Sequence, residues 1–495
     1  MPDRAAHIAN LSLPLNRLPD PLPIPPIEHP FDVTVRPPGS KSITNRALLL
    51  AALAEGVSEL RGALVEADDA RVMVRALEQL GAKVDISSLE SQVSEGALDE
   101  QPLVRVTGVG GRWKIASGGS VRLDLHNAGT ATRFLTAAAV LAPAGTSVVI
   151  DGDTRMRERP IGELADALRS LGVGIEYLGS PGCPPLRVTP PADFKALASS
   201  VTFEDAQSSQ FISAMMLVAP FLARPTTVHV RGPLTSEPYI AMSRELLGRL
   251  LSRQGGPKLS GTHKGGTTSF TMPTHRLKGF TLDVEPDASG ATYFEAAGAL
   301  VAGSRATIRG VDLGPRGSLQ GDTQFVSVLT AAGATVERLD NALRVSGPRA
   351  LAPLIVVLDD MPDTAMTAAV LACFATATKQ NPSAISEIRG LRTLRVKETD
   401  RLAALKAELS KVGARVEIVH EGGDEGLRIT PPAYALAGRP PVPPAIFDTY
   451  NDHRMAMSLA LLGLRVPGVQ VRNPGCVAKT YPTFWRDFAK LYASR

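Results

Sequence analysis

The chain has 495 residues, of which 44% are hydrophobic and 21% are charged, values that are ordinary for a globular protein of two or more domains. Its net charge of +4 argues against a protein that coats a polyanion, and its 5% of aromatic residues argues against base-stacking platforms. The three cysteines and eight histidines form no CxxC or HExxH pattern. We therefore expect a reducing, cytoplasmic location, with no disulfide framework, metal site or cofactor.

The first thirty residues are rich in proline and lack both the apolar core of a signal peptide and the acid-poor look of a transit peptide. We expect residues 1–30 to form an irregular N-terminal arm. Apolar runs elsewhere, such as Ala131–Ala142, are too short and too rich in alanine to span a bilayer, so no membrane partner is expected.

The stretch Pro37–Ala54 (PPGSKSITNRALLLAALA) combines a Pro-Pro-Gly hinge, a basic polar turn and an Ala/Leu run that favours a helix. The start of a helix carries unpaired N–H groups and partial positive charge, and Lys41 and Arg46 add two full charges. This pattern predicts a site for a phosphate or carboxylate, although a charged first turn alone is more often simply solvated.

The same pattern returns twice before residue 170. Leu125–Ala142 (LHNAGTATRFLTAAAVLA) has a tight turn at Gly129 before an Ala-rich helix, and Asp151–Leu168 (DGDTRMRERPIGELADAL) places three arginines ahead of another helix. A solvated basic loop remains an equal alternative for the second of these.

Uncharged polar turns follow at Gln207–Leu217 (QSSQFISAMML) and Leu234–Ile240 (LTSEPYI). Their hydroxyl and amide groups could contact a ligand, but helix capping alone is the more common role of such residues. The candidates are Ser208, Ser209, Gln210, Ser236 and Tyr239.

The second half repeats the pattern with more charge. Asp363 lies in MPDTAMTAAVLA and can be interpreted as an ordinary helix start. Leu394–Lys406 (LRVKETDRLAALK) packs five charged residues between a strand and a helix, and Tyr450–Leu462 (YNDHRMAMSLALL) and Asn473–Tyr481 (NPGCVAKTY) bring further cations. If these helix starts converge, their charge exceeds what one phosphate requires, which favours two small anionic substrates or one highly charged ligand.

An internal repeat underlies these turns. Four helix-like segments end at a glycine that suits the left-handed position after a helix, and each continues into two strands that resemble a hairpin. The glycines are Gly81, Gly172, Gly333 and Gly413, and a fifth, degraded copy is expected over Leu250–Met272. The repeat predicts an α/β protein in which a few copies pack around each of two cores.

The polar turns PPGSKSITNRALLLAALA, NAGTATRF, RMRERPIG, SSQFISAMM, LRVKETDRL, YNDHRMAMS and AKTYP resemble, in the same order, the motifs of the 5-enolpyruvylshikimate-3-phosphate synthases among the enolpyruvyl transferases. The resemblance covers about residues 31–490. It implies an inside-out α/β barrel of two similar lobes, each of three βαβαββ units, with the active site in the interlobe cleft. One lobe would comprise residues 40–284 and the other residues 31–39 plus 285–495.

The resemblance also implies transfer of the enolpyruvyl group of phosphoenolpyruvate to the 5-hydroxyl of shikimate 3-phosphate, with release of phosphate, by addition and elimination through a tetrahedral intermediate. By the same resemblance Asp363, Glu398 and Lys41 are catalytic. The phosphoenolpyruvate contacts would be Lys41, Gly129, Arg155, Gln210, Arg401, Arg454 and Lys479. The shikimate 3-phosphate contacts would be Ser42, Arg46, Ser208, Ser209, Gln210, Ser236, Tyr239, Asp363 and Lys397.

The chain departs from the family pattern at Thr393, where many relatives carry Asn, at Phe134, where a Pro is common, and over Ser87–Gly119, which is longer than usual. Alternatives are the sister enzyme that acts on UDP-N-acetylglucosamine, for which Cys183 is the only candidate loop cysteine, a nucleic-acid-binding protein, and a non-catalytic relative. We expect a monomer that takes small anionic substrates and binds neither nucleic acid nor membrane.

Overall fold

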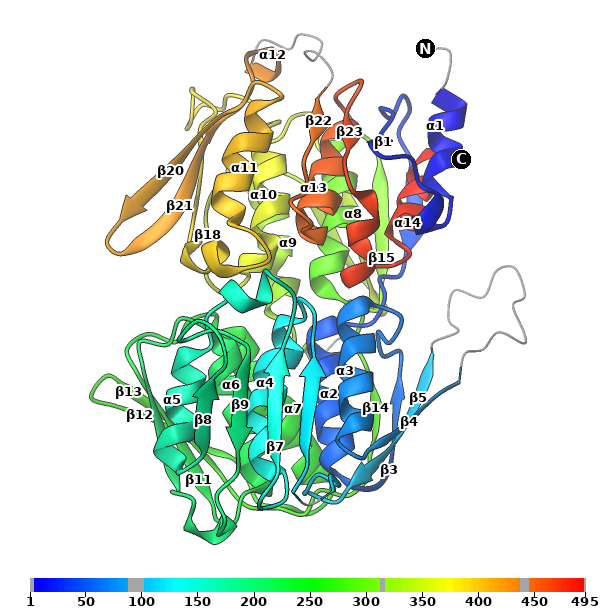
Figure 1. Ribbon diagram of the computed structural model, residues 1–495. Coiled ribbons are helices and arrows are strands. Elements are labelled where there is room, and N and C mark those ends of the chain that lie inside the picture. Colours follow the sequence, from blue (N-terminus) through cyan, green and yellow to red (C-terminus); the bar gives the residue numbers. More distant parts are fainter. Residues whose placement is uncertain (1–3, 88–101, 117, 312–316, 437–444, 494–495) are drawn as a thin grey trace. The chain divides into compact units, whose positions relative to one another are not determined.

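The computed structural model describes residues 4–87, 102–116, 118–311, 317–436 and 445–493. The chain divides into two compact units, which we call unit 1 (Met1–Pro38 with Pro286–Arg495) and unit 2 (Gly39–Glu285). The elements of both units are labelled in Figure 1. The α/β prediction is confirmed, because both units combine helices with small mixed sheets.

In its described residues, unit 2 contains three four-stranded sheets. Their strand orders are β14-β3-β5-β4, β6-β7-β9-β8 and β10-β11-β13-β12, and in each the first pair is parallel and the other two pairs are antiparallel. The strands are β3 (Glu55–Arg61), β4 (Lys83–Ser87), β5 (Leu103–Val109), β6 (Ser120–Asp124), β7 (Ser147–Asp151), β8 (Gly174–Tyr177), β9 (Leu186–Thr189), β10 (Ser200–Glu204), β11 (Thr226–Arg231), β12 (Ser260–Lys264), β13 (Thr267–Met272) and β14 (Thr281–Asp283).

Antiparallel hairpins form where the internal repeat predicts them, including the fifth copy, in which β12 pairs with β13 from Ser260↔Thr271 to Lys264↔Thr267. Gly172 shows why a glycine ends the helix that precedes each hairpin. Its φ of 99° lies in the left-handed region, and its N–H bonds back to the carbonyl of Arg169. Part of the long stretch expected over Ser87–Gly119, residues 88–101 and 117, lies outside the described residues.

The helices of unit 2 fall into a buried set and a surface set. α4 is buried along its whole length, and α2 and α6 are buried along nearly all of theirs. The helices are α2 (Lys41–Leu53), α3 (Asp68–Gln79), α4 (Gly129–Ala138), α5 (Gly162–Leu171), α6 (Ser209–Val218) and α7 (Glu237–Arg253), with short 3-10 turns η2 (Ala139–Leu141), η3 (Met156–Glu158), η4 (Phe194–Ala196) and η5 (Ala219–Phe221).

Unit 1 has two four-stranded sheets and one three-stranded sheet, with strand orders β16-β17-β15-β2, β18-β19-β21-β20 and β1-β23-β22. The strands are β1 (Leu22–Pro23), β2 (Asp32–Val35), β15 (Arg305–Arg309), β16 (Thr335–Leu339), β17 (Ala342–Ser346), β18 (Ile355–Val357), β19 (Ser386–Arg389), β20 (Arg415–Glu421), β21 (Asp424–Thr430), β22 (Ile446–Phe447) and β23 (Gln470–Val471).

The N-terminal arm is not irregular throughout, contrary to the sequence prediction. Arg4–Leu11 forms helix α1, Leu15–Arg17 forms the turn η1, and β1 pairs with β23 through Leu22↔Val471. Leu11 and Leu22 are fully buried in the core of unit 1, so the apolar residues of the arm contribute to packing that its proline content conceals.

The core of unit 1 is centred on three helices, α8 (Ala288–Leu300), α10 (Ala365–Ala372) and α13 (His453–Gly463), every residue of which is buried. An aromatic cluster around Phe484, which includes Tyr293 and Trp485, packs beside them. The other elements are α9 (Phe325–Ala331), α11 (Arg401–Ser410), α12 (Ala433–Leu436), α14 (Phe484–Ala489), η7 (Gly321–Gln324), η8 (Pro362–Thr364), η9 (Arg392–Val396), η10 (Pro474–Lys479) and η11 (Lys490–Tyr492).

Two kinds of feature are absent from the described residues, membrane-spanning helices and groups of metal-ligating side chains. None of their helices combines the length and apolar character that a membrane span requires. Within the same residues, no three or more His, Cys, Asp and Glu side chains are grouped so that they could hold a metal ion.

Candidate functional site

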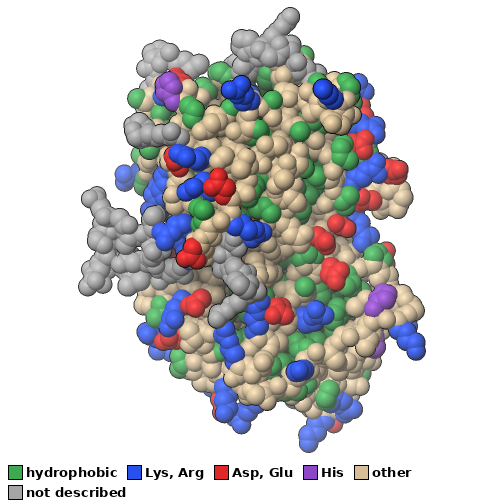
Figure 2. Space-filling model, turned by 180° about the vertical axis from the view of Figure 1, so that it is seen from behind, with side chains coloured by type: hydrophobic (Ala, Val, Ile, Leu, Met, Phe, Trp, Pro, Cys, Tyr) green, Lys and Arg blue, Asp and Glu red, His purple; other side chains and the backbone are tan. Residues whose placement is uncertain are grey.

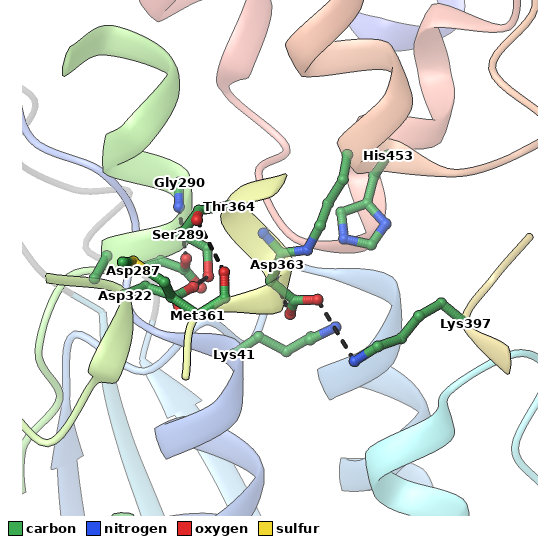
Figure 3. A network of polar contacts seen from close by, with 12 residues as sticks. Lys41, Asp287, Ser289, Gly290, Asp322, Met361, Asp363, Thr364, Lys397 and His453 are labelled. Atoms are coloured by element: carbon green, nitrogen blue, oxygen red, sulfur yellow. Dashed lines mark hydrogen bonds and ion pairs between the residues drawn. The ribbon is translucent and has the colours of Figure 1, made fainter. Parts of the chain in front are cut away.

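Unit 1 gathers three cations around Asp363, which lies in the turn η8 immediately before α10. One carboxylate oxygen, Oδ1, is 3.0 Å from Nη1 of Arg401 and 3.6 Å from Nζ of Lys397. The other, Oδ2, is 2.9 Å from Nη2 of Arg454. Asp363 and Lys397 point toward each other in Figure 3. Residues from three separate stretches of the sequence, at positions 363, 397–401 and 454, therefore meet at one carboxylate.

Arg401 is the centre of this cluster. Its side chain is fully buried, and its guanidinium bonds Asp452 at 2.8 Å, Glu398 at 2.9 Å and Asp363 at 3.0 Å. Burial opposes the charged form, but the three carboxylates outweigh it and raise the pKa of Arg401. The arginine is therefore permanently charged and orients two of the predicted catalytic carboxylates.

Glu398 has a second cationic partner, since its Oε1 is 3.2 Å from Nζ of Lys479 at the end of η10. Lys397, the preceding residue, lies on the other side of the cluster, and burial lowers the pKa of its ammonium group. The structure thus brings together all six predicted residues of unit 1. They are Asp363, Lys397, Glu398, Arg401, Arg454 and Lys479.

Local sequence explains why these side chains face one way. Asp400 and Asp452 are N-caps, and their carboxylates accept from the backbone N–H of Ala403 and Arg454, respectively. Each cap fixes the first turn of its helix, so Arg401 opens α11 and Arg454 lies in the first turn of α13. Asp452 is not among the site residues that the sequence predicts, yet besides capping α13 it neutralises Arg401.

Two further buried acids in unit 1 were not singled out from the sequence as site residues. Asp322 accepts a hydrogen bond from Ser289 (Figure 3), and burial together with the charge of Asp363 raises its pKa to about 7. Burial and Asp322 raise the pKa of Glu295, in the middle of α8, to about 8, and its Oε2 is buried without a hydrogen-bond partner. A glutamate inside an otherwise apolar helix was the available signal.

In unit 2, Lys41 is the first residue of α2, and its ammonium lies 3.5 Å from Oδ2 of Asp69 in the first turn of α3. Asp69 is almost completely buried, as an acidic side chain rarely is without a partner. Sequence reasoning did not include Asp69, although a paired acidic start (Asp68-Asp69) after a turn was visible. Asp69 orients the lysine that the sequence predicts to be catalytic.

Arg46 lies one turn further along α2 and is enclosed in the unit. Its guanidinium donates to the hydroxyl of Ser243 at 2.7 Å and to the carbonyls of Ser42 and Tyr239 at 2.8 and 3.0 Å. Burial lowers its pKa to about 10. The ring of Phe134, the departure from the family pattern, lies 5.2 Å from the guanidinium carbon and contributes a cation–π contact. Arg46 therefore joins α2 to α4, α6 and α7.

The arginine whose guanidinium lies beside Gly129 is Arg159. Oδ1 of Asn127 accepts from its Nη1 at 3.0 Å, and its buried Nε has no hydrogen-bond partner. A Cβ atom added at Gly129 would come within 2.6 Å of Nη2 of Arg159, so only glycine permits this approach. Arg155, the predicted contact, bonds Glu158 at 2.9 Å and is partly exposed. The sequence shows all three arginines of RMRERP, but it does not show that Arg159 is buried whereas Arg155 is partly exposed.

The hydroxyl and amide candidates lie at the starts of α6 and α7. Ser208 caps α6 by accepting from the N–H of Gln210, whose amide group is 3.4 Å from the hydroxyl of Thr130 in α4. Ser236 has a left-handed φ of 50° immediately before α7. These contacts bring Gln210 next to the start of α4, while Ser42, Ser209 and Tyr239 occupy first turns of α2, α6 and α7.

Charges of both signs are interspersed on the face drawn in Figure 2.

Thr393, another of the departures from the family pattern, has a buried hydroxyl with no hydrogen-bond partner. Cys183 lies in the β8–β9 hairpin, and burial raises the pKa of its thiol, which disfavours the reactive thiolate form.

Comparisons with known proteins identify the family of the chain. The sequence model of the family described as EPSP synthase (3-phosphoshikimate 1-carboxyvinyltransferase) matches residues 27–488. The chain is 42% identical over 466 residues to the 3-phosphoshikimate 1-carboxyvinyltransferase of Thiobacillus denitrificans, covering 92% of this chain and 96% of the relative. It is 41% identical over 464 residues to that of Laribacter hongkongensis, covering 93% and 97%.

A solved structure of EPSP synthase from Acinetobacter baumannii is similar to this one with a TM-score of 0.67 at 23% identity, over 93% of this chain and 96% of that chain. This similarity concerns the fold, whereas the sequence matches extend over nearly the whole chain. The chain belongs to the EPSP synthase (3-phosphoshikimate 1-carboxyvinyltransferase) family.

Proposed function

We propose that the chain transfers the enolpyruvyl group of phosphoenolpyruvate to the 5-hydroxyl of shikimate 3-phosphate and releases phosphate. The observation that carries this proposal is the Asp363 cluster, in which two carboxylates that could move protons lie among four cations that could hold anions. Membership of the family supplies the substrates.

The reaction needs a proton acceptor at the attacking hydroxyl. We assign this role to Asp363, whose carboxylate lies within ion-pair distance of Arg401, Arg454 and Lys397. The hydroxyl oxygen forms a bond to C2 of phosphoenolpyruvate while its proton passes to the carboxylate, and C3 gains a proton. The resulting intermediate then loses a proton from C3, the C2–O bond to phosphate breaks, and phosphate leaves. Glu398 and Lys41 are the candidates for the proton transfers at C3, and either can serve each step.

The remaining predicted contacts stay proposals, refined by burial. Lys41, Gly129, Gln210, Arg454 and Lys479 are proposed to bind phosphoenolpyruvate. Arg159, with its unpartnered Nε beside Gly129, supports an anion there better than Arg155 does. For shikimate 3-phosphate the proposed contacts are Ser42, Ser208, Ser209, Ser236, Tyr239, Lys397 and Asp363. Arg46 and Arg401 are buried and act through the residues that they position.

The test is a phosphate-release assay with both substrates on the wild type, on Lys41→Met and on Asp363→Ala. We expect kcat to fall by a factor on the order of 1,000 in each variant, because each removes a group that acts on the reacting atoms. The matched controls are Lys83→Met and Asp359→Ala, which alter exposed residues of the same types in unit 2 and unit 1 and should retain activity. Wild-type protein without turnover would refute the function, and active Lys41 and Asp363 variants would refute the site.

Replacing shikimate 3-phosphate by UDP-N-acetylglucosamine tests the sister activity. The raised pKa of Cys183 argues against it, because a thiol that stays protonated is a poor nucleophile and acid. We expect no phosphate release with the sugar nucleotide. We also expect glyphosate to compete with phosphoenolpyruvate, and turnover that is unaffected at saturating glyphosate would contradict that expectation.

We further propose that the chain acts as a monomer in the cytoplasm. The cysteine usage of the sequence supports a reducing compartment. Sedimentation analysis at the enzyme concentrations of the assay tests the proposed state, and a dimer under those conditions would contradict it.

A further inference from the structure

A cavity of about 620 Å³ lies in unit 2 at the end of α2 opposite to Lys41. Leu53, the last residue of α2, lines it, and a helix of 13 residues places the two ends about 20 Å apart. The cavity is therefore separate from the cluster of groups described at the helix starts. Its volume falls within the range of small-molecule sites.

The walls come from the ends of buried helices. Pro220, Phe221 and Leu222 follow α6, and Arg112 donates to the carbonyl of Ala142, just beyond α4, at 3.0 Å. His275 is tied to the same region, because its N–H bonds the carbonyl of Pro220 at 2.9 Å. A lining formed by anchored helix ends provides a largely pre-formed shape.

Aromatic and cationic groups are combined on this lining. The guanidinium carbon of Arg112 lies 3.7 Å from the centre of the Phe194 ring, the shortest such distance in the described part of the chain. Phe221 contributes a second ring. A stacked guanidinium keeps its edge N–H groups available for a carboxylate while its face rests on the ring.

The charge on this lining is only partly compensated. Arg276 bonds Glu55 at 2.8 Å, but among the described residues no carboxylate lies within ion-pair distance of Arg112. Burial correspondingly lowers the pKa of Arg112, as expected for a cation without a counter-ion. Gly111, which also lines the cavity, has a φ of 94°, in the left-handed region that glycine adopts readily.

We propose that this cavity binds a planar aromatic compound that carries one negative charge, with its carboxylate on Arg112 and its ring beside Phe194 and Phe221. Flat rings match the two phenylalanine side chains, and a single carboxylate matches the planar donor fork of arginine. This site is independent of the proposed enzymatic function, since it shares no residue with the proposed substrate contacts.

The test uses benzoate as the probe and the full-length wild-type chain, with binding followed by saturation-transfer NMR and calorimetry. Benzamide keeps the ring but removes the charge, and cyclohexanecarboxylate keeps the charge but removes the aromatic ring. We expect benzoate to bind with a Kd on the order of 1 mM or below, and both analogues to bind at least about tenfold more weakly. Equal binding of the three probes would overturn the proposal.

Two variants test whether benzoate binds in this cavity. Arg112→Gln and Phe194→Leu should each weaken benzoate at least about tenfold, because one removes the counter-ion and the other removes the ring face. Arg169→Gln is the matched control, since Arg169 also lies over an aromatic ring, that of Tyr177, at 5.0 Å but outside the cavity. Thermal unfolding identifies any variant that fails to fold, and Phe194→Leu keeps the test valid if loss of the Arg112 hydrogen bond destabilises the chain.

Competition separates this site from the substrate groups. Saturating phosphoenolpyruvate and shikimate 3-phosphate should leave the benzoate Kd unchanged, because the cavity lies at the other end of α2. Displacement of benzoate by either substrate, or unaltered benzoate binding by both variants, would overturn the assignment. The test measures benzoate binding and does not use turnover by Arg112→Gln. A wild type without activity would therefore refute the proposed function but would not contradict this inference.

Discussion

Two buried arginines, Arg401 in unit 1 and Arg46 in unit 2, lie in the first two turns of their helices but have opposite surroundings. Arg401 contacts three carboxylates, which raise its pKa against the effect of burial. Arg46 contacts hydroxyl and carbonyl oxygens, and burial lowers its pKa to about 10. The charge of Arg401 is thus neutralised by carboxylates, whereas that of Arg46 is balanced only by neutral hydroxyl and carbonyl oxygens.

The largest expected effect in this comparison is that of Arg401→Met. Removing the guanidinium leaves Asp452, whose side chain is fully buried, without its ion-pair partner, and an uncompensated buried charge costs about 3–5 kcal/mol. We expect the free energy of unfolding, measured by denaturant titration, to fall by this amount and phosphate release to be lost. A variant as stable as the wild type would show that the cluster is not held together by Arg401.

Arg46→Met should have a smaller effect, because it leaves neutral oxygens unsatisfied rather than a carboxylate. The expected loss is about 1–3 kcal/mol for the hydroxyl and carbonyl groups that lose a donor. The same denaturant titration measures it, and Arg244→Met, an exposed arginine of α7, is the matched control. If Arg46→Met destabilised the chain more than Arg401→Met, the comparison between the two arginines would be reversed.

Much of the fold could be predicted from the sequence because its signals are local. In each repeat a glycine in the left-handed conformation ends the helix, and a β-branched strand follows it. The hairpins after Gly172 and Gly413 form from these strands. The N-terminal arm could not be predicted in this way. α1 and β1 form because Leu11 and Leu22 find partners far away in the sequence, at the C-terminal end of the chain, and no local pattern reveals such packing.

Gly129→Ala tests the close approach in unit 2. The added methyl group would meet Nη2 of Arg159 at 2.6 Å, so the guanidinium must move by several tenths of an ångström or more. We expect the KM for phosphoenolpyruvate to rise about tenfold, which corresponds to about 1.4 kcal/mol, with a smaller change for shikimate 3-phosphate. An equal rise in both KM values would contradict a specific role of Arg159.

The candidate site was predicted in part, because residue type can be read from a motif but burial cannot. Glu398 lies in a dense run of charge and Asp363 is indicated only by the family resemblance, and the structure places both against Arg401. Among the arginines of RMRERP the sequence offers no way to decide, since side-chain direction in a short 3-10 turn depends on what packs beneath it. The sequence prediction does not include Asp69, because nothing in the sequence shows that its carboxylate lies beside Lys41.

The last expected effect depends on pH and concerns the acids near the unit 1 cluster, through Glu295→Gln. The pKa of Glu295 is raised to about 8, above the value of about 4.3 for an unfolded chain, so the folded state favours the protonated form. Its contribution to stability is complete below pH 4 and is lost as the pH rises toward 8. Between those limits the wild type should lose up to about 1.4 kcal/mol per pH unit that Glu295→Gln does not lose.

Unfolding free energies of both proteins at pH 5 and pH 8 measure this difference. Glu337→Gln, at an exposed position of the same unit, is the control and should follow the wild type at both pH values. Because Asp322 also has a raised pKa, of about 7, part of the pH dependence should persist in Glu295→Gln. Parallel curves for the wild type and Glu295→Gln would mean that Glu295 is ionised in the folded chain, and unit 1 would then hold one more buried negative charge against its cations than the comparison with unit 2 assumes.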